Sequence, residues 1–183
     1  MNKSINRDNF VMKVFIASDL HGSFYFVNRL IDRFNAENGD LLILLGDILY
    51  HGPRNDLPKD YNPKKVIELL NSLSDKIVCV QGNCDAEVDG MVLNFEVLTP
   101  YRKLIVDGIT MHLTHGHKHN PEKPLSANAG EVVLFGHSHI PYDKVLNGVR
   151  YINPGSLSIP KENSRHSYLT FYNGEFTFNS LDN

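Results

Sequence analysis

Five apolar segments of the chain each end at side chains that can bind a metal ion. Val14 to Ala17 precedes Asp19 and His21, Leu41 to Leu45 precedes Asp47, Ile77 to Val80 precedes Asn83, Thr110 to Thr114 precedes His115, and Val132 to Phe135 precedes His137 and His139. Continuous apolar segments of this length predict strands that are covered on both faces. We therefore expect buried strands whose ends place polar side chains at the edge of a sheet.

Apolar residues at helical spacing separate the first two predicted strands. Residues 24–36 predict a helix, which implies a right-handed crossover between parallel strands. Asp19 and Asp47 should then emerge at the same sheet edge. A turn-rich loop at residues 50–58 leads to a second helix, for which Asn62 is the expected N-cap. A loop in this position is a natural wall for a site.

Three dipeptides in the second half are strong hairpin signals. Asp107-Gly108, Asn147-Gly148 and Asn173-Gly174 each separate two apolar segments. These hairpins predict antiparallel or mixed sheet after the initial alternation of strands and helices. We expect an α/β (α+β) fold in which two packed sheets carry outer helices. A single domain should span residues 12–183. Residues 1–9 are polar and mixed in charge, and we expect residues 1–11 to form a flexible N-terminal extension.

Composition and charge exclude several classes of protein. The chain has 183 residues, of which 42% are hydrophobic, enough for a substantial core. A net charge of -3 gives no sign of a broad surface for extended nucleic acid. Cys79 and Cys84 lie too close together to indicate a disulfide framework, so we expect a reducing, cytoplasmic location. The sequence contains no apolar segment long enough to predict a membrane span. It does not determine the oligomeric state, and a homo-oligomer is possible.

The residues at the strand ends have the chemistry of a binuclear metal site. Aspartate, histidine and asparagine suit divalent Mn, Fe, Co, Ni or Zn better than Ca. The seven candidates are Asp19, His21, Asp47, Asn83, His115, His137 and His139. Seven ligands are close to what two ions need if one carboxylate bridges them, and Asp47 is the best bridge. Two such ions would attract a phosphate and stabilise an in-line displacement, so the pattern predicts hydrolysis of a phosphate ester.

Each motif also has an ordinary structural explanation. Asp19-x-His21 alone is more often a plain loop, and Gly46-Asp47 or Gly82-Asn83 can serve turn geometry. His115 and His137 can be structural histidines held by hydrogen bonds. Five such accidents, all at strand ends, are less probable than one metal site.

The ordered set of motifs resembles the calcineurin-like metallophosphoesterases. The motifs are Asp19-x-His21, Gly46-Asp47 followed by Gly52, Gly82-Asn83-Cys84-Asp85, Thr114-His115-Gly116-His117 and Gly136-His137-Ser138-His139. Residues 51–55, 82–85 and 153–156 are similar to the bacterial YfcE-type phosphodiesterases in particular. The resemblance implies a four-layer αββα sandwich of two mixed sheets flanked by helices. It also implies that Asp19, His21, Asp47 and His139 hold one ion, and that Asp47, Asn83, His115 and His137 hold the other.

Cys84 departs from the pattern of many relatives, in which a histidine at this position donates a proton to the leaving group. General acid catalysis typically contributes about 10²- to 10⁴-fold, so its absence favours substrates with an acidic leaving alcohol. YfcE-type relatives share this cysteine. Cys84 can instead be a nucleophile, but the sequence provides no obvious base for it.

Four further assignments have weaker support. Arg54 can bind a phosphate oxygen, and His117 can contact the substrate. Asp85 can orient a metal-binding side chain without binding the metal itself. Residues 153–156 should shape the backbone of the site and take no part in its chemistry.

We therefore expect a metal-dependent phosphodiesterase in which a hydroxide bridging the metals attacks the phosphorus of a small phosphodiester in line. Its catalytic residues would be Asp47, Asn83, Cys84 and His115, and its cofactors two divalent ions, Mn before Ni, Co, Fe or Zn. The alternative is a catalytically silent module that keeps the fold for protein binding, as the metallophosphoesterase-like retromer subunit does. A metallo-β-lactamase-like hydrolase would need a His-x-His-x-Asp-His motif, and Ile140-Pro141 follows His139 instead.

Overall fold

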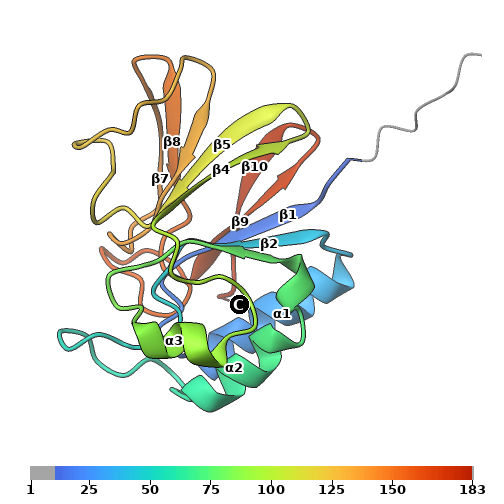
Figure 1. Ribbon diagram of the computed structural model, residues 1–183, viewed down its shortest axis with the longest axis vertical. Coiled ribbons are helices and arrows are strands. Elements are labelled where there is room, and N and C mark those ends of the chain that lie inside the picture. The colour runs from blue at the N-terminus through green and yellow to red at the C-terminus, as the bar shows by residue number, and fades with distance from the viewer. Residues whose placement is uncertain (1–10, 183) are drawn as a thin grey trace, which may run out of the picture.

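Two five-stranded sheets pack face to face in the computed structural model, which describes residues 11–182 (Figure 1). The first sheet has the order β10-β9-β1-β2-β3. Its strands are β1 (Val14–Ala17), β2 (Leu41–Leu44), β3 (Ile77–Cys79), β9 (Ser167–Tyr172) and β10 (Glu175–Ser180). β1, β2 and β3 run parallel, as the crossover predicts, and the C-terminal hairpin joins beside β1 in antiparallel pairing. The carboxyl ends of the parallel strands therefore share one edge.

The second sheet has the order β4-β5-β6-β8-β7. It comprises β4 (Tyr101–Val106), β5 (Ile109–Thr114), β6 (Val132–Leu134), β7 (Tyr142–Leu146) and β8 (Val149–Asn153). β5, β6 and β8 are parallel, whereas β4 and β7 pair through the predicted hairpins. This sheet is mixed, as predicted.

The helices cover the outer face of the first sheet (Figure 1). They are α1 (Phe24–Ala36), α2 (Pro63–Asn71), the short 3₁₀ helix η1 (Ser74–Lys76) and α3 (Glu87–Val92). Asn62 caps α2 as expected, since its side chain accepts a hydrogen bond from the Lys65 N–H at 3.3 Å. α3 was not predicted, because its six residues contain Gly90 and are too short for a helical apolar period.

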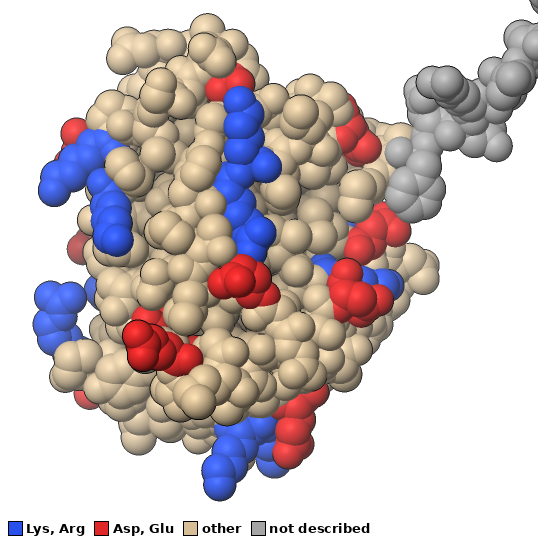
Figure 2. Space-filling model, in the orientation of Figure 1, with Lys and Arg blue, Asp and Glu red and all other residues tan. Residues whose placement is uncertain are grey.

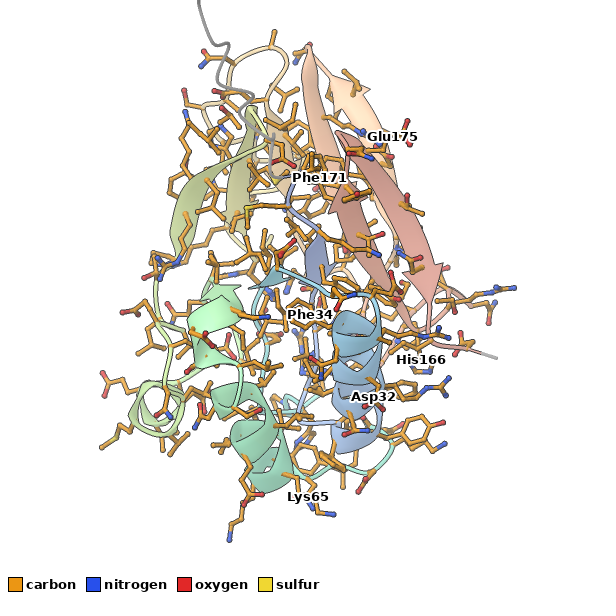
Figure 3. The ribbon with its side chains drawn as sticks, turned by 90° about the vertical axis from the view of Figure 1, so that its right-hand side faces the viewer. Asp32, Phe34, Lys65, His166, Phe171 and Glu175 are labelled. Carbon is orange, nitrogen blue, oxygen red and sulfur yellow. The ribbon has the colours of Figure 1, made fainter. Side chains whose placement is uncertain are left out.

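β1 is buried on both sides, which explains its unbroken apolar sequence. Phe15 and Ala17 belong to the core under the helices, where the Phe15 and Phe34 rings lie 5.3 Å apart. Val14 and Ile16 belong to the core between the sheets, with Phe171 (Figure 3). The strand is therefore the shared centre of both cores.

These observations confirm the predicted fold class of two mixed sheets with flanking helices. On the outer face of the second sheet, the segment that covers Val133, Phe135 and Tyr151 contains no helix within the described chain. This segment, residues 118–130, includes Pro121, Pro124 and Gly130, which disfavour a helix. The flexible extension expected at residues 1–11 lies outside the described residues, apart from Val11.

Candidate metal centre

The ends of strands from both sheets meet at one place. Backbone hydrogen bonds join the turn after β1 to the turn after β2, from the Asp19 N–H to the Gly46 carbonyl (3.1 Å) and from the His21 N–H to the Asp47 carbonyl (2.9 Å). In the second sheet, the Gly136 N–H donates to the His115 carbonyl at 2.7 Å. The candidate ligands follow β1, β2, β3, β5 and β6, and the two-sheet architecture brings these five strand ends together.

Five candidate ligands have backbone angles that most residues avoid. Asp19, His21, Asp47, His137 and His139 have φ values of 57°, 47°, 55°, 67° and 61°. Asp, Asn and His tolerate this left-handed region better than other non-glycine residues, at a cost of order 1 kcal/mol each. The surrounding structure therefore maintains sharp turns that direct these side chains to one side.

The side chains form a compact buried cluster around two carboxylates. Asp19 Oδ1 lies 3.2 Å from His139 Nε2, 3.8 Å from His21 Nε2 and 4.0 Å from His115 Nε2. Asp47 Oδ2 lies 3.7 Å from His21 Nε2 and 3.4 Å from His115 Nε2. Asp47 therefore faces both halves of the cluster, which is the position that a bridging ligand requires.

Backbone carbonyls fix the orientation of three imidazoles. The Nδ1 atoms of His21, His115 and His139 each lie 2.7 Å from a carbonyl oxygen, those of Tyr50, Leu45 and Ile159. Because a carbonyl oxygen only accepts, each Nδ1 must carry the hydrogen. The Nε2 atoms then face the carboxylates, the arrangement that metal-binding histidines commonly show.

The cluster has the features that a cation would satisfy. Asp19 Oδ1 is fully buried and has no hydrogen-bond partner among residues 11–182. His21 Nε2 and His139 Nε2 lie only 3.4 Å apart, although in the neutral rings both would present lone pairs. Three groups of potential ligand atoms each fit within 4.8 Å: Asp19 with His21 and His139, Asp19 with Asp47 and His115, and His21 with Asp47 and Cys84. The donor set of carboxylate oxygens and imidazole nitrogens therefore suits divalent cations.

In the cation-free cluster, the protonation states of some histidines favour binding of a cation, and that of another opposes it. Burial lowers the pKa of His21 and of His137, so their neutral, ligand-competent forms dominate. Burial would also lower the pKa of His115, but its hydrogen bond to Asp47 and the charges of both aspartates raise this pKa to about 9. A cation must therefore displace a proton from His115.

The outer members of the predicted set are positioned differently. Asn83 Oδ1 lies 3.0 Å from His115 Nε2, so the amide reaches the cluster. The ring of His137 lies beside that of His115, with centroids 5.2 Å apart, and belongs to none of the three groups above. The backbone N–H of His137 donates to Asp19 Oδ2 at 3.0 Å. The structure thus brings six candidate side chains into direct proximity and places the half-buried seventh at the rim.

Asp85 supports the cluster from behind. Its carboxylate accepts three backbone N–H bonds, from Asp47 (2.9 Å), Ile48 (2.8 Å) and Gly82 (2.7 Å). Burial raises the pKa of Asp85 to about 6, because these hydrogen bonds offset only part of the desolvation. Asp85 therefore ties the turn after β2 to the turn after β3, the two turns that carry Asp47 and Asn83.

The segment after β8 supports the other side. The hydroxyls of Ser156 and Ser158 donate to the Asp19 carbonyl at 2.9 and 3.1 Å, and Asn153 Nδ2 donates to the Gly136 carbonyl at 2.8 Å. Residues 153–156 thus make the backbone contacts that their predicted shaping role requires. Ser158 was not singled out from the sequence, where a serine in a loop gives no specific signal.

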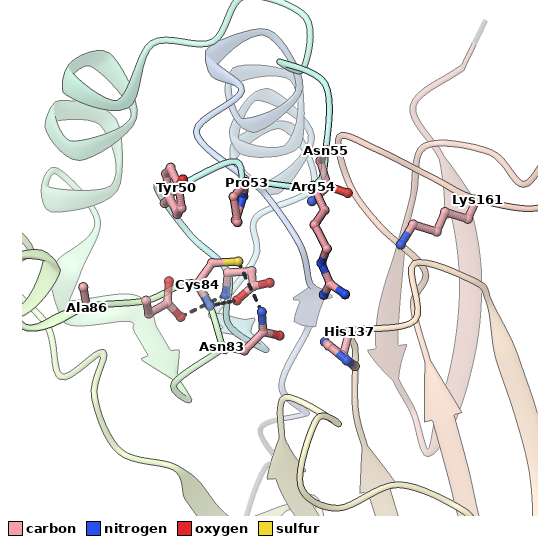
Figure 4. A pocket seen from close by; sticks show the side chains of 12 residues that line it. Tyr50, Pro53, Arg54, Asn55, Asn83, Cys84, Ala86, His137 and Lys161 are labelled. Atoms are coloured by element: carbon pink, nitrogen blue, oxygen red, sulfur yellow. Dashed lines mark hydrogen bonds between the residues drawn. The ribbon is translucent and has the colours of Figure 1, made fainter.

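A cavity of about 760 Å³ opens beside Asp47 (Figure 4). Arg54 and Asn55 enter it from the loop after β2, Asn83 and Cys84 from the turn after β3, and Lys161 from the connection between β8 and β9. The predicted substrate ligand Arg54 therefore lies at the cavity. Lys161 was missed, because no motif marks a lone lysine in a loop.

His117 does not line this cavity. Its ring packs near those of His115 and His137, with centroids 5.4 and 6.1 Å away. Burial and the neighbouring His115 lower the pKa of His117 to about 4. A contact between His117 and substrate stays a prediction.

Cys84 is half-buried beside Asp47. Its backbone N–H donates to Asp47 Oδ1 at 2.7 Å, and its sulfur lies 3.3 Å from Asn83 Nδ2. Burial and the charge of Asp47 raise the pKa of the Cys84 thiol to about 12. The thiol of the cation-free protein is therefore protonated at neutral pH, which disfavours the nucleophile interpretation.

Gly82 allows the turns after β2 and β3 to approach closely. A Cβ atom at this position would overlap the carboxylate and the backbone nitrogen of Asp47. We expect Gly82→Ala to displace Asp47, to destabilise the fold by about 1–3 kcal/mol, and to reduce metal binding. Thermal unfolding and Mn titration would measure both effects. Gly90→Ala in α3 is the control, since its Cβ would meet only the tip of Leu98 at 3.1 Å; unchanged Mn binding by Gly82→Ala would contradict the assignment.

Comparison with known proteins identifies the family of the chain. Residues 12–174 match the calcineurin-like phosphoesterase superfamily domain. The chain belongs to this superfamily. Among calcineurin-like relatives, it is 41% identical over 158 residues to Phosphodiesterase YfcE of Escherichia coli K12, covering 86% of each chain. It is 31% identical over 182 residues to the Probable metallophosphoesterase YsnB of Bacillus subtilis, covering 93% of this chain and 91% of that one.

Solved structures of other proteins show the same fold. The structure of YfcE, described as a phosphoesterase from E. coli, superposes with a TM-score of 0.91 at 39% identity and covers 93% of this chain and 94% of that one. The structure of Vacuolar Protein Sorting 29 from Cryptosporidium parvum, at 14% identity and a TM-score of 0.60, shares the fold alone. Within the described residues, no helix is long and apolar enough to cross a membrane.

Proposed function

We propose that the protein is a metal-dependent phosphodiesterase that hydrolyses small phosphodiesters. The observation that carries this proposal is the unpartnered, buried Asp19 Oδ1, which faces three imidazole Nε2 atoms next to an open cavity. Two divalent cations, when bound, would lower the pKa of water and stabilise the attacking and leaving oxygens of an in-line displacement. The resemblance to YfcE supports the choice of a diester as the substrate.

The residues divide between two cation positions. Asp19, His21, Asp47 and His139 would hold one cation, and Asp47, Asn83, His115 and His137 the other. The short distances from Asp47 Oδ2 to both His21 and His115 support its shared position. Because His137 lies at the rim, its ring would have to turn inward to hold the second cation.

The cavity residues would bind and orient the substrate. Arg54 reaches toward Asn83 and His137 in Figure 4, so its guanidinium can hold a non-bridging phosphate oxygen in two hydrogen bonds. Cys84 takes the place beside Asn83 where a proton donor would stand, and its neutral thiol is a weak donor. The preferred substrate should therefore have an acidic leaving alcohol.

Further properties follow as parts of the same proposal. Mn is the expected metal, with Ni, Co, Fe or Zn as alternatives. The two free cysteines support a reducing, cytoplasmic environment. On the face in Figure 2, basic and acidic side chains are interspersed, which supports a small substrate over extended nucleic acid. A homo-oligomer stays a prediction.

The test of this function is hydrolysis of bis-para-nitrophenyl phosphate by protein reconstituted with Mn. We expect turnover that a chelator abolishes and added Mn restores. A reconstituted protein that binds Mn but hydrolyses neither this diester nor the para-nitrophenyl monoester would favour the silent protein-binding module.

Metal binding should depend on pH because of His115. Its pKa of about 9 in the cation-free cluster means that a proton occupies the ring at neutral pH. Cation and proton compete, so we expect Mn affinity to rise with pH up to about 9 and proton release on binding. Calorimetry in two buffers of different ionisation enthalpy measures this release. Identical heats in both buffers would contradict the competition.

A further inference from the structure

Two cationic side chains converge on the cavity beside the cluster. Arg54 comes from the loop after β2 and lies over Asn83 and His137, whereas Lys161 comes from the connection between β8 and β9 and points toward them from farther out (Figure 4). Neither side chain has a carboxylate within 4.0 Å in the described part of the chain. Both cations are exposed, whereas the carboxylates that also line the cavity, Asp47 and Asp85, are buried. The accessible charge of the cavity therefore favours an anion there.

The backbone of Lys161 is fixed to the candidate metal centre. Its N–H donates to the His139 carbonyl at 3.2 Å, and its carbonyl accepts from the Ser164 N–H at 3.0 Å and hydroxyl at 2.6 Å. Glu162 and Asn163 between them both have positive φ, 53° and 55°, which makes a tight turn. The base of the lysine is therefore held relative to His139, although its side chain is exposed.

The charge of a simple phosphodiester leaves Lys161 without a partner. A diester phosphate carries one negative charge. The cations held by the candidate metal centre and the guanidinium of Arg54 would already face this charge. In Figure 4, Lys161 lies farther from Asn83 and His137 than Arg54 does, and it lines the same cavity. An ester arm that extends from the cluster through this cavity would approach it. A second anionic group on such an arm would give the charge of Lys161 an ionic partner.

We propose that Lys161 binds a second negatively charged group, a phosphate or a carboxylate, on one ester arm of the phosphodiester substrate. This inference rests on the proposed function, since it names the class of diester that the site prefers. Lys161 is then a specificity residue that does not touch the reacting atoms. Uncharged diesters should be accepted, but less efficiently than those with an anionic arm.

The experiment compares para-nitrophenyl diesters that differ in the second arm only. Propyl, carboxyethyl and phosphonoethyl arms have similar size, and an aminoethyl arm reverses the charge. We expect the Mn-loaded wild type to show kcat/KM about two- to fivefold higher for the anionic arms than for propyl at low salt, the range of an exposed charge contact. High salt should reduce this preference.

Substitution of Lys161 separates the proposal from a role in the chemistry. Lys161→Met should abolish the preference by lowering kcat/KM for the anionic arms more than for the propyl diester, and Lys161→Arg should retain the preference. Lys64→Met, an exposed lysine of α2, is the matched control and should change nothing. Equal kcat/KM for all arms in the wild type, or an equal loss for all arms in Lys161→Met, would overturn the proposal.

Binding provides a readout that does not require turnover. Calorimetry should show that carboxyethyl phosphate binds more tightly than propyl phosphate to wild type, and equally to Lys161→Met. If no diester is hydrolysed but this difference holds, the proposed function fails and the anion site stands. If hydrolysis occurs without the difference, the anion site fails alone.

Discussion

Replacing Asp47 with asparagine should reduce hydrolysis of an aryl phosphodiester by about 10³-fold or more, the largest effect that we expect of any single substitution. Asparagine has the same shape and retains an oxygen for the Cys84 N–H, which lies 2.7 Å from Asp47 Oδ1. The substitution removes only the negative charge that faces His21 and His115. A cation shared between the two halves of the cluster would lose its anionic partner. Steady-state rates at saturating Mn, with Mn content measured on the same sample, determine the loss.

The control for Asp47 is an exposed aspartate of similar chemistry. Asp75→Asn, in η1, changes the net charge equally and should leave the rate and the Mn content unchanged. His139→Ala should resemble Asp47→Asn in activity, since its Nε2 lies nearest to Asp19 Oδ1 among the three imidazoles. Turnover like that of wild type in both variants would show that the reaction takes place elsewhere.

Replacing Asp85 with alanine should reduce activity by about 10- to 100-fold, although Asp85 touches neither substrate nor metal in this account. Three buried backbone N–H groups would lose their acceptor. Each unsatisfied donor costs about 1–3 kcal/mol, so the free energy of unfolding should fall as well. The turns that carry Asp47 and Asn83 would separate. Urea unfolding, Mn affinity and kcat together measure this effect.

Asp89 provides a matched control for Asp85. It is also a buried carboxylate that accepts a backbone N–H, that of Ala86 at 2.9 Å, but it caps α3 away from the cluster. Asp89→Ala should lower stability and leave Mn affinity unchanged. If both variants lose stability and neither loses Mn affinity, Asp85 has a purely structural role and the positioning role assigned to it is wrong.

The sequence predicted those parts of the fold that local patterns determine. Consecutive apolar residues in Val14 to Ala17 indicated a strand that is covered on both faces, and β1 indeed lies between the helices and the second sheet. Asp107-Gly108 and its two counterparts predicted the hairpins, because only turn chemistry is needed there. The convergence of strand ends followed from parallel strands, whose carboxyl ends must share an edge.

Contacts that depend on tertiary structure were not predictable from the sequence. Lys161 reaches the cavity because its turn is bound to the His139 carbonyl, far from the strand-end motifs in sequence. The Nδ1 bonds of the three histidines go to backbone carbonyls, which have no sequence signature. α3 and the non-helical segment at residues 118–130 also lack a periodic pattern.

The metal content of the intact protein decides whether the strand-end cluster holds two cations. Protein prepared without chelator, reconstituted with Mn and desalted would be analysed by mass spectrometry for Mn per chain, beside Asp47→Asn prepared identically. We expect about two ions per wild-type chain, as a cluster that supports in-line displacement requires, and fewer in the variant. Wild-type protein that hydrolyses the diester while retaining no metal would contradict this expectation.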